Sequence, residues 1–281
     1  MRPCPRGGAC GKGSSHDAAA GPGSQFEQCA ARASSDAVAR SADSSALPPP
    51  RITGVPVDDE GTIRFVLDYL GMELEPSILV GGWATFYRIG GDTSDDIDLI
   101  LGSDDMRDKV HSILDEVSES NHLQGRKWRG EIERIHVDIY LPYQSELGDA
   151  LRLRVEELAK HTEALEGTKW RLLTIEAHAV SKMAALLDRP SSIKGGKDAR
   201  EVLRLLERGV DAERACSILA TASSRPLTDL PPRIGEVFDL LGPRSQANKA
   251  QRKRIRHWKR EWLDAIDRQA RPGVRARPGL E

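Results

Sequence analysis

Short apolar runs alternate with amphipathic stretches over residues 58–141. Apolar side chains recur at helical spacing in three segments, which predicts helices over 58–70, 83–89 and 105–117. The runs between them favour β-structure, and strands are expected at 77–80, 96–101, 127–129 and 133–141. The last two are predicted to form a hairpin that turns at Gly130-Glu131. In 133–141 the apolar residues alternate with His136, Asp138 and Tyr140, so these three share one face of the sheet.

From residue 145 onward the pattern is almost entirely helical. Helices are predicted over 146–161, 174–188, 197–208, 211–221, 231–241 and 247–269, with one short strand at 170–173. Residues 1–50 are rich in Gly, Ala, Ser and Pro and have no period, which predicts a disordered leader. The expected organisation is therefore this leader, a small mixed α/β domain over 51–145, a helical domain over 146–240 and a C-terminal helix and tail over 241–281.

Composition narrows the class of protein. Of the 281 residues, 39% are hydrophobic and 30% are charged, and no apolar run approaches the roughly 20 residues of a membrane-spanning helix. This excludes a transmembrane protein. The first thirty residues lack the apolar segment of a signal peptide, so we expect a cytoplasmic protein. Four cysteines are too few for a disulfide scaffold.

The net charge of −2 hides an asymmetry along the chain. Residues 241–281 contain twelve Lys and Arg against four Asp and Glu, so residues 1–240 carry an excess of ten acidic residues. A basic tail on an acidic body indicates an anionic partner for the tail.

Three carboxylates lie where predicted strands could bring them together. Asp96 and Asp98 are two residues apart in one strand and share a face, and Asp138 follows in a separate strand. Two carboxylates about 4 Å apart repel by about 4 kcal/mol at an effective dielectric near 20, so a fold that gathers them does so around cations. Mg²⁺ is the natural candidate because it prefers oxygen ligands and shares them with phosphates.

A glycine pair complements the carboxylates. Gly81-Gly82 lies between a predicted strand and a predicted helix, where a backbone without Cβ atoms and a helix N-terminus can bind phosphate. The hydroxyls of Thr93 and Ser94 could add donors. The combination predicts a site for a metal-bound nucleoside triphosphate.

These residues resemble the nucleotidyltransferase superfamily of the polymerase-beta type. The similarity lies in Val80-Gly81-Gly82-Trp83-Ala84, in the run from Thr93 to Leu99, and in Val137-Asp138-Ile139-Tyr140. The segments 182–189 and 192–198 resemble the helical part of AbiEii-like nucleotidyltransferase toxins, and the whole similarity spans about residues 60–208. It implies an α+β fold in which a mixed sheet of four or five strands is flanked by helices and followed by a helical domain.

The resemblance also implies an activity, the transfer of a nucleoside monophosphate from a nucleoside triphosphate to a hydroxyl. Asp96, Asp98 and Asp138 then match the ligands of two Mg²⁺ ions. Gly81, Gly82 and Ser94 match the phosphate-contacting motif. Lys182 could reach the phosphates as a point charge, with Lys197 and Asp198 as the next candidates. Each of these three has a plain alternative, because Lys182 could be a surface lysine, Lys197 a solvated loop residue and Asp198 a charge at a helix N-terminus.

Several acceptors and partners stay open. The toxin resemblance and the basic tail favour a macromolecule, RNA or tRNA or a protein, within a toxin-antitoxin or abortive-infection system with a cognate antitoxin. The last helix could clamp RNA through its Lys and Arg side chains, or it could simply dock its tryptophans. One alternative is a transferase that modifies a small molecule of the aminoglycoside type. Another is a non-catalytic protein that keeps the fold and binds RNA or another partner.

Overall fold

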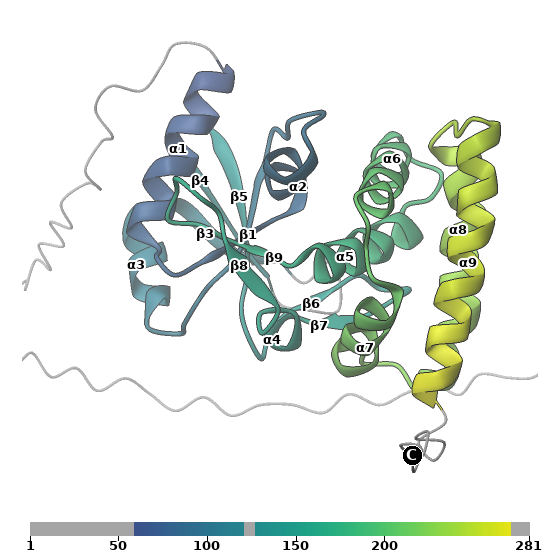
Figure 1. Ribbon diagram of the computed structural model, residues 1–281. Coiled ribbons are helices and arrows are strands. Elements are labelled where there is room, and N and C mark those ends of the chain that lie inside the picture. The colour runs from purple at the N-terminus through teal and green to yellow at the C-terminus, as the bar shows by residue number, and fades with distance from the viewer. Residues whose placement is uncertain (1–58, 121–126, 271–281) are drawn as a thin grey trace, which may run out of the picture. The chain divides into compact units, whose positions relative to one another are not determined.

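The computed structural model describes residues 59–120 and 127–270, and its central feature is a seven-stranded mixed sheet (Figure 1). Its strands are β1 (Ile78–Val80), β2 (Ile97–Ile100), β3 (Asp115–Ser120), β4 (Lys127–Ile132), β5 (Ile135–Tyr140), β8 (Thr162–Ala164) and β9 (Arg171–Leu173). They lie in the order β3-β4-β5-β2-β1-β9-β8. The pairs β2–β5 and β1–β9 are parallel and the others are antiparallel. The α+β prediction is confirmed, although the sheet exceeds the expected four or five strands.

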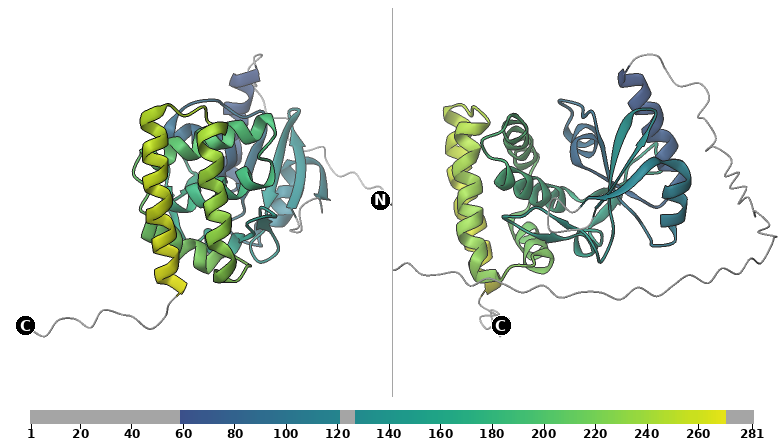
Figure 2. Two further views of the ribbon diagram at one scale, coloured as in Figure 1. Left: turned by 90° about the vertical axis from the view of Figure 1, so that its right-hand side faces the viewer. Right: turned by 180° about the vertical axis from the view of Figure 1, so that it is seen from behind.

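Helices cover both faces of the sheet. The first three are α1 (Asp59–Glu73), α2 (Gly81–Ile89) and α3 (Met106–Ile113). The later ones are α4 (Val155–Leu158), α5 (Ile175–Asp188), α6 (Ile193–Glu207), α7 (Ala212–Ala222), α8 (Leu230–Arg244) and α9 (Lys249–Ala270). Figure 2 shows α8 and α9 side by side, and they run antiparallel in the helical layer beyond α5 and α6. The helices predicted from 174 to 269 are present, with ends that differ by a few residues.

Strand alternation divides the core between the two faces. Ile97 and Leu99 of β2 pack with α1 and α3 in one apolar cluster. Ile100 belongs to the other cluster, with α5 and the later helices. Asp98 therefore lies on the face that carries α5. The predicted alternation in β5 is confirmed as well, since Ile135, Val137, Ile139 and Leu141 all lie in the first cluster.

Two predictions in the first half were wrong. The helix expected over 105–117 ends at Ile113, and Asp115–Ser120 forms an edge strand that pairs with β4. The expected turn at Gly130-Glu131 is instead part of β4, and the chain turns at Glu133 and Arg134, both with positive φ. Gly130 is needed within the strand because a Cβ there would lie 2.9 Å from the Leu114 side chain.

The helix predicted over 146–161 was also wrong. The chain forms a two-stranded ribbon of β6 (Glu146–Leu147) and β7 (Leu153–Arg154), followed by the single turn α4. Gly148 has a φ of 81°, which interrupts a helix. Leu151, Leu153 and Val155 are fully buried at alternate positions, so the pattern that looked helical has a period of two.

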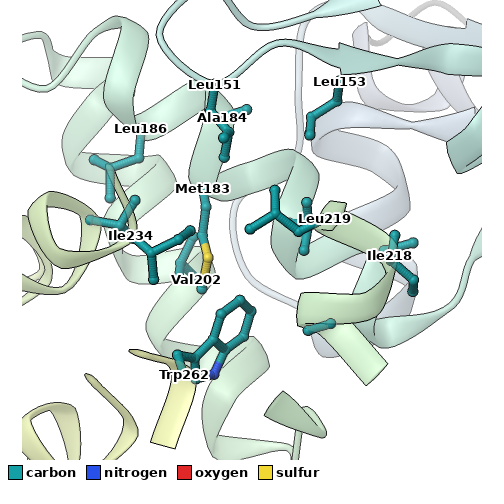
Figure 3. Packing of buried hydrophobic residues seen from close by; sticks show 14 of the residues in the cluster. Leu151, Leu153, Met183, Ala184, Leu186, Val202, Ile218, Leu219, Ile234 and Trp262 are labelled. Atoms are coloured by element: carbon teal, nitrogen blue, oxygen red, sulfur yellow. The ribbon is translucent and has the colours of Figure 1, made fainter. Parts of the chain in front are cut away.

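The helical layer has a continuous apolar core. Figure 3 shows Met183 of α5, Val202 of α6, Leu219 of α7 and Trp262 of α9 meeting in it. Trp262 is 1% exposed and makes an edge-to-face contact with Phe238. In the described part of the chain, every helix is too short or too polar to cross a membrane. The expected leader over 1–50 and the end of the tail lie outside the described residues, and the division into domains stays a prediction.

Candidate active site

The chain passes from β1 directly into α2 at Gly81 and Gly82. Gly81 has a φ of 66°, and a Cβ there would lie 2.0 Å from Oδ2 of Asp98. A Cβ on Gly82 would lie 2.6 Å from Cβ of Ser94. Both positions therefore require glycine. The close approach leaves the first backbone N–H groups of α2 near the carboxylates, where they can bind an anion.

We call this strand-to-helix turn at Gly81-Gly82 the elbow. Two buried side chains, Thr85 and His178, hold it in place. The Thr85 hydroxyl donates to the carbonyl oxygen of Gly81 at 2.9 Å and also lies 2.9 Å from Nε2 of His178 on α5. Burial, followed by the charges of Lys182 and Arg88, holds the pKa of His178 well below its usual range. His178 is therefore neutral. Because the Thr85 hydrogen is used on Gly81, the His178 Nε2–H donates to Thr85 and ties α5 to the elbow.

Strand register brings the three predicted carboxylates together. Asp98 of β2 is the direct neighbour of Asp138 in the parallel strand β5, and adjacent strands lie about 4.8 Å apart. Asp98 is also the register partner of Val80, the last residue before the elbow. Asp96 precedes β2 by one residue. The elbow and all three carboxylates thus occupy one end of three neighbouring strands.

Asp98 has the least compensated charge of the three. Burial raises its pKa to about 6, and the neighbouring charges of Asp96 and Asp138 act in the same direction. Lys182 and Lys127 oppose this effect only in part. An added cation at Asp98 would therefore be bound favourably.

Asp96 is stabilised in its charged form. Burial acts to raise its pKa, but the hydroxyl of Ser94, which donates to its carboxylate, and the charge of Lys194 outweigh burial and lower the pKa. The Lys194 Nζ lies 3.7 Å from Oδ2 of Asp96. Ser94 was predicted to contact phosphate, which stays a prediction, and in the structure its hydroxyl donates to the Asp96 carboxylate.

Asp138 is held by two basic residues of β4 that the sequence analysis did not single out. Lys127 Nζ donates to Oδ2 at 2.7 Å, and Arg129 donates through Nε to Oδ1 at 2.7 Å and through Nη2 to Oδ2 at 3.0 Å. Burial acts to raise the pKa of Asp138, but these contacts lower it. A correct hairpin turn would have identified Arg129, because it is the register partner of Asp138.

The predicted basic residues of α5 and α6 belong to a buried ion-pair network. Lys182, 6% exposed, lies with Nζ 2.7 Å from Oε2 of Glu201 and 3.9 Å from Oδ1 of Asp198. Arg189 binds both oxygens of Asp198. Lys197 Nζ lies 4.0 Å from Oε1 of Glu201. The surface-lysine alternative for Lys182 is therefore wrong, and Glu201 is a further residue that the sequence analysis missed.

These groups line one pocket of about 450 Å³, a size typical of small-ligand sites. Its lining contains nine of the ten predicted site residues: Gly81, Gly82, Ser94, Asp96, Asp98, Asp138, Lys182, Lys197 and Asp198. Thr93 is absent from the lining, and its carbonyl oxygen accepts a hydrogen bond from Lys197 at 2.8 Å. Six Lys or Arg and five Asp line the pocket, which therefore suits an anionic ligand accompanied by a cation.

The carboxylates fit Mg²⁺ in part. Within residues 59–120 and 127–270, no three His, Cys, Asp or Glu side chains are disposed to hold one ion. Both oxygens of Asp138 face Lys127 and Arg129. Asp96 and Asp98 offer the hard oxygen ligands that Mg²⁺ prefers, and the charge of Asp98 is poorly compensated. Asp138 could join them only if its ion pairs opened.

Comparisons with known proteins identify no sequence family, and the solved structures described below are only distantly similar to this chain. No protein-family model matches the chain, and no curated protein matches its sequence. An antigenic nucleotidyltransferase-like protein from Paracoccidioides brasiliensis is 15% identical with a TM-score of 0.37, covering 64% of this chain and 91% of that one. ANT(2'')-Ia in complex with adenylyl-2''-tobramycin is 18% identical with a TM-score of 0.40, covering 57% and 95%. The solution structure of the antibiotic-resistance factor ANT(2'')-Ia is 19% identical with a TM-score of 0.40, covering 58% and 92%.

Proposed function

We propose that the protein is a Mg²⁺-dependent nucleotidyltransferase that moves a nucleoside monophosphate from a nucleoside triphosphate to a hydroxyl. The observation that carries this proposal is the placement of Asp98 and Asp138 on neighbouring strands, with Asp96 directly before β2, beside the Gly81-Gly82 elbow. An elbow with free N–H groups suits phosphate. A carboxylate cluster suits the cations that accompany a triphosphate.

In this proposal, one set of residues binds the triphosphate and another holds the metal ion. The N–H groups of the elbow and the ammonium groups of Lys182 and Lys197 would bind the triphosphate. Asp96 and Asp98 would hold Mg²⁺, which neutralises charge on the transferring phosphoryl group when bound. The acceptor oxygen forms a bond to the α-phosphorus as the bond to the leaving pyrophosphate breaks. The hydroxyl proton passes to a carboxylate of the cluster and then to solvent.

We further propose RNA, including tRNA, as the class of acceptor, on account of α9. Residues 249–260 contain seven Lys or Arg and no Asp or Glu. Among the described residues only two of the seven make ion pairs, Arg254 with Glu207 and Lys259 with Asp239. Cations are unfavourable near a helix N-terminus, so this half of α9 suits a polyanion. The toxin role and the cognate antitoxin stay predictions that follow from the resemblance.

The test is a transfer assay with α-³²P-labelled nucleoside triphosphates, MgCl₂ and three acceptors: total RNA, total protein and tobramycin. We expect label on RNA, and loss of at least about a hundredfold in rate with Asp96→Ala, because metal and charge stabilisation of this kind contributes several kcal/mol. Asp92→Ala is the matched control, since Asp92 is exposed and lies outside the pocket lining. Label on tobramycin alone would favour the small-molecule alternative. No transfer by the unmodified protein, with RNA binding intact, would favour a non-catalytic binding protein.

A further inference from the structure

The sheet order sets the groups around the pocket in a line. The elbow follows β1, Asp98 lies on β2, Asp138 on β5, and Lys127 with Arg129 on β4. Three strand steps separate β1 from β4, a distance of about 14 Å at about 4.8 Å per step. The pocket therefore has the N-terminus of α2 at one end of this line and two cations at the other, with the carboxylates between them.

The cations on β4 keep donors available for a ligand. Arg129 uses Nε and Nη2 on Asp138, and its Nη1 makes no hydrogen bond within the described residues. Its side chain is 48% exposed and lines the pocket. Lys127 is 16% exposed and has three N–H donors, of which Asp138 takes one. An anion can therefore bind the outer edge of Arg129 and Lys127 while Asp138 stays paired.

The two ends of the line serve different molecules if the proposed function holds. A triphosphate at the elbow extends toward the carboxylates, where its α-phosphate reacts, and the acceptor must approach from the opposite side. That side is the β4 end. A polycationic acceptor such as an aminoglycoside would meet the charges of Lys127 and Arg129 there, whereas a phosphate would be attracted.

We propose that Lys127 and Arg129 form an anion subsite that binds a phosphate of the acceptor, and that they select phosphate-bearing acceptors over polycationic ones. The identification of this ligand as the acceptor rests on the proposed function. The phosphate could belong to RNA or to a small phosphorylated molecule. Arg129 and Lys127 would be specificity-determining residues in either case.

The experiment compares Arg129→Gln with Lys194→Gln, two single removals of an exposed cation from the pocket lining, one beside Asp138 and one beside Asp96. Binding of a fluorescein-labelled 12-nucleotide RNA is measured by anisotropy at several NaCl concentrations, and binding of a fluorescent ATP analogue with MgCl₂ is measured separately. We expect Arg129→Gln to weaken RNA binding about five- to tenfold and to reduce the slope of log K against log salt by about 0.7, the loss of one single-strand phosphate contact. ATP-analogue binding should change less than twofold. Lys194→Gln should do the reverse.

Ribose 5-phosphate distinguishes the two sources of the phosphate. If it displaces the RNA from the unmodified protein but not from Arg129→Gln, the subsite serves a small phosphorylated acceptor; if it does not displace the RNA, the subsite serves RNA. The proposal is overturned if Arg129→Gln leaves RNA affinity and salt slope unchanged, or if it weakens the ATP analogue instead. Binding requires no turnover, so a failed transfer assay would contradict the proposed function without deciding this result. Thermal unfolding by circular dichroism checks that both variants fold.

Discussion

At the scale of single residues, the surroundings of an aspartate decide the direction in which its pKa shifts. Asp96 and Asp98 are two residues apart, yet the pKa of Asp96 is lowered and that of Asp98 is raised to about 6. Asp96 has the Ser94 hydroxyl and Lys194 beside it. Asp98 is packed against Gly81 and has Asp138 on the neighbouring strand. The sequence places Asp96 and Asp98 on one face of a predicted strand, but it does not show that their pKa values shift in opposite directions.

Asp98→Asn should stabilise the metal-free protein at pH 8. The folded state holds a proton on Asp98 up to about pH 6, while an unfolded carboxyl loses it near pH 4. The unmodified protein therefore loses stability as pH rises from 4 to 6 and stays destabilised above 6. Because Asp98 borders an open pocket and solvent screens its charge, we expect a gain of about 1 to 2 kcal/mol for Asn at pH 8 that vanishes below pH 4.

Urea unfolding in EDTA, at pH values from 4 to 8, measures this difference. Asp96→Asn is the control with the opposite sign, because a lowered pKa means that the charged form stabilises the fold. An Asp98→Asn protein that is no more stable than the unmodified protein at pH 8 would contradict the expected effect of burial.

At the scale of elements, the site depends on how α5 and α6 pack against each other. Ser192 caps α6 through the N–H of Gly195, so this helix starts at Ile193, before the predicted 197. A Cβ on Gly195 would lie 2.0 Å from the carbonyl oxygen of Arg189. The tight turn between the helices brings Glu201 against Lys182 and orients two pocket lysines. Sequence spacing shows each helix but not the buried carboxylate between them.

Glu201→Gln should destabilise the protein by about 2 to 3 kcal/mol, because it leaves the buried Lys182 without its nearest counter-charge. The distant contact with Asp198 keeps the cost below that of a fully unpaired charge. Glu207→Gln, on the same helix, removes a more exposed pair with Arg254 and should cost less than about 1 kcal/mol. Adding Lys182→Met to Glu201→Gln should recover stability. Equal effects of Glu201→Gln and Glu207→Gln in urea unfolding would refute the network's role.

At the scale of the whole molecule, α9 has a buried apolar stripe and a set of exposed cations on the same helix. Its apolar stripe is part of the helical core, with Ile255, Trp262 and Ile266 buried. Six of its seven cations at 249–260 are exposed; Arg254 pairs with Glu207, and the other five are Lys249, Arg252, Lys253, Arg256 and Arg260. Four of them, at 249, 253, 256 and 260, follow helical spacing over about 16 Å. Docking and polyanion binding therefore need not exclude each other.

Charge reversal tests the exposed face without disturbing the buried one. Lys253→Glu with Arg256→Glu should weaken RNA binding at least tenfold and lower its salt dependence, with an unchanged melting temperature because both side chains are exposed. Lys160→Glu with Lys169→Glu makes the same change in net charge at exposed positions outside α9. Equal weakening by both pairs would show that net charge alone matters. Deleting residues 241–281 is unsuitable, because it would remove Trp262 from the core.

The sequence by itself determined the α+β class, most helices, the Gly81-Gly82 elbow and the side of β5 that carries Asp138. These features follow from local patterns, since periodicity and glycine chemistry act over a few residues. The sequence pattern predicted the hairpin turn at the wrong residues. It also predicted a helix over 146–161, a segment whose apolar positions fit both a helical and a strand period. Only the tertiary structure brought Lys127 and Arg129 to Asp138 and Glu201 to Lys182. The burial that raises the pKa of Asp98 also depends on it. These depend on strand register and helix packing between residues distant in the chain, which no local pattern encodes.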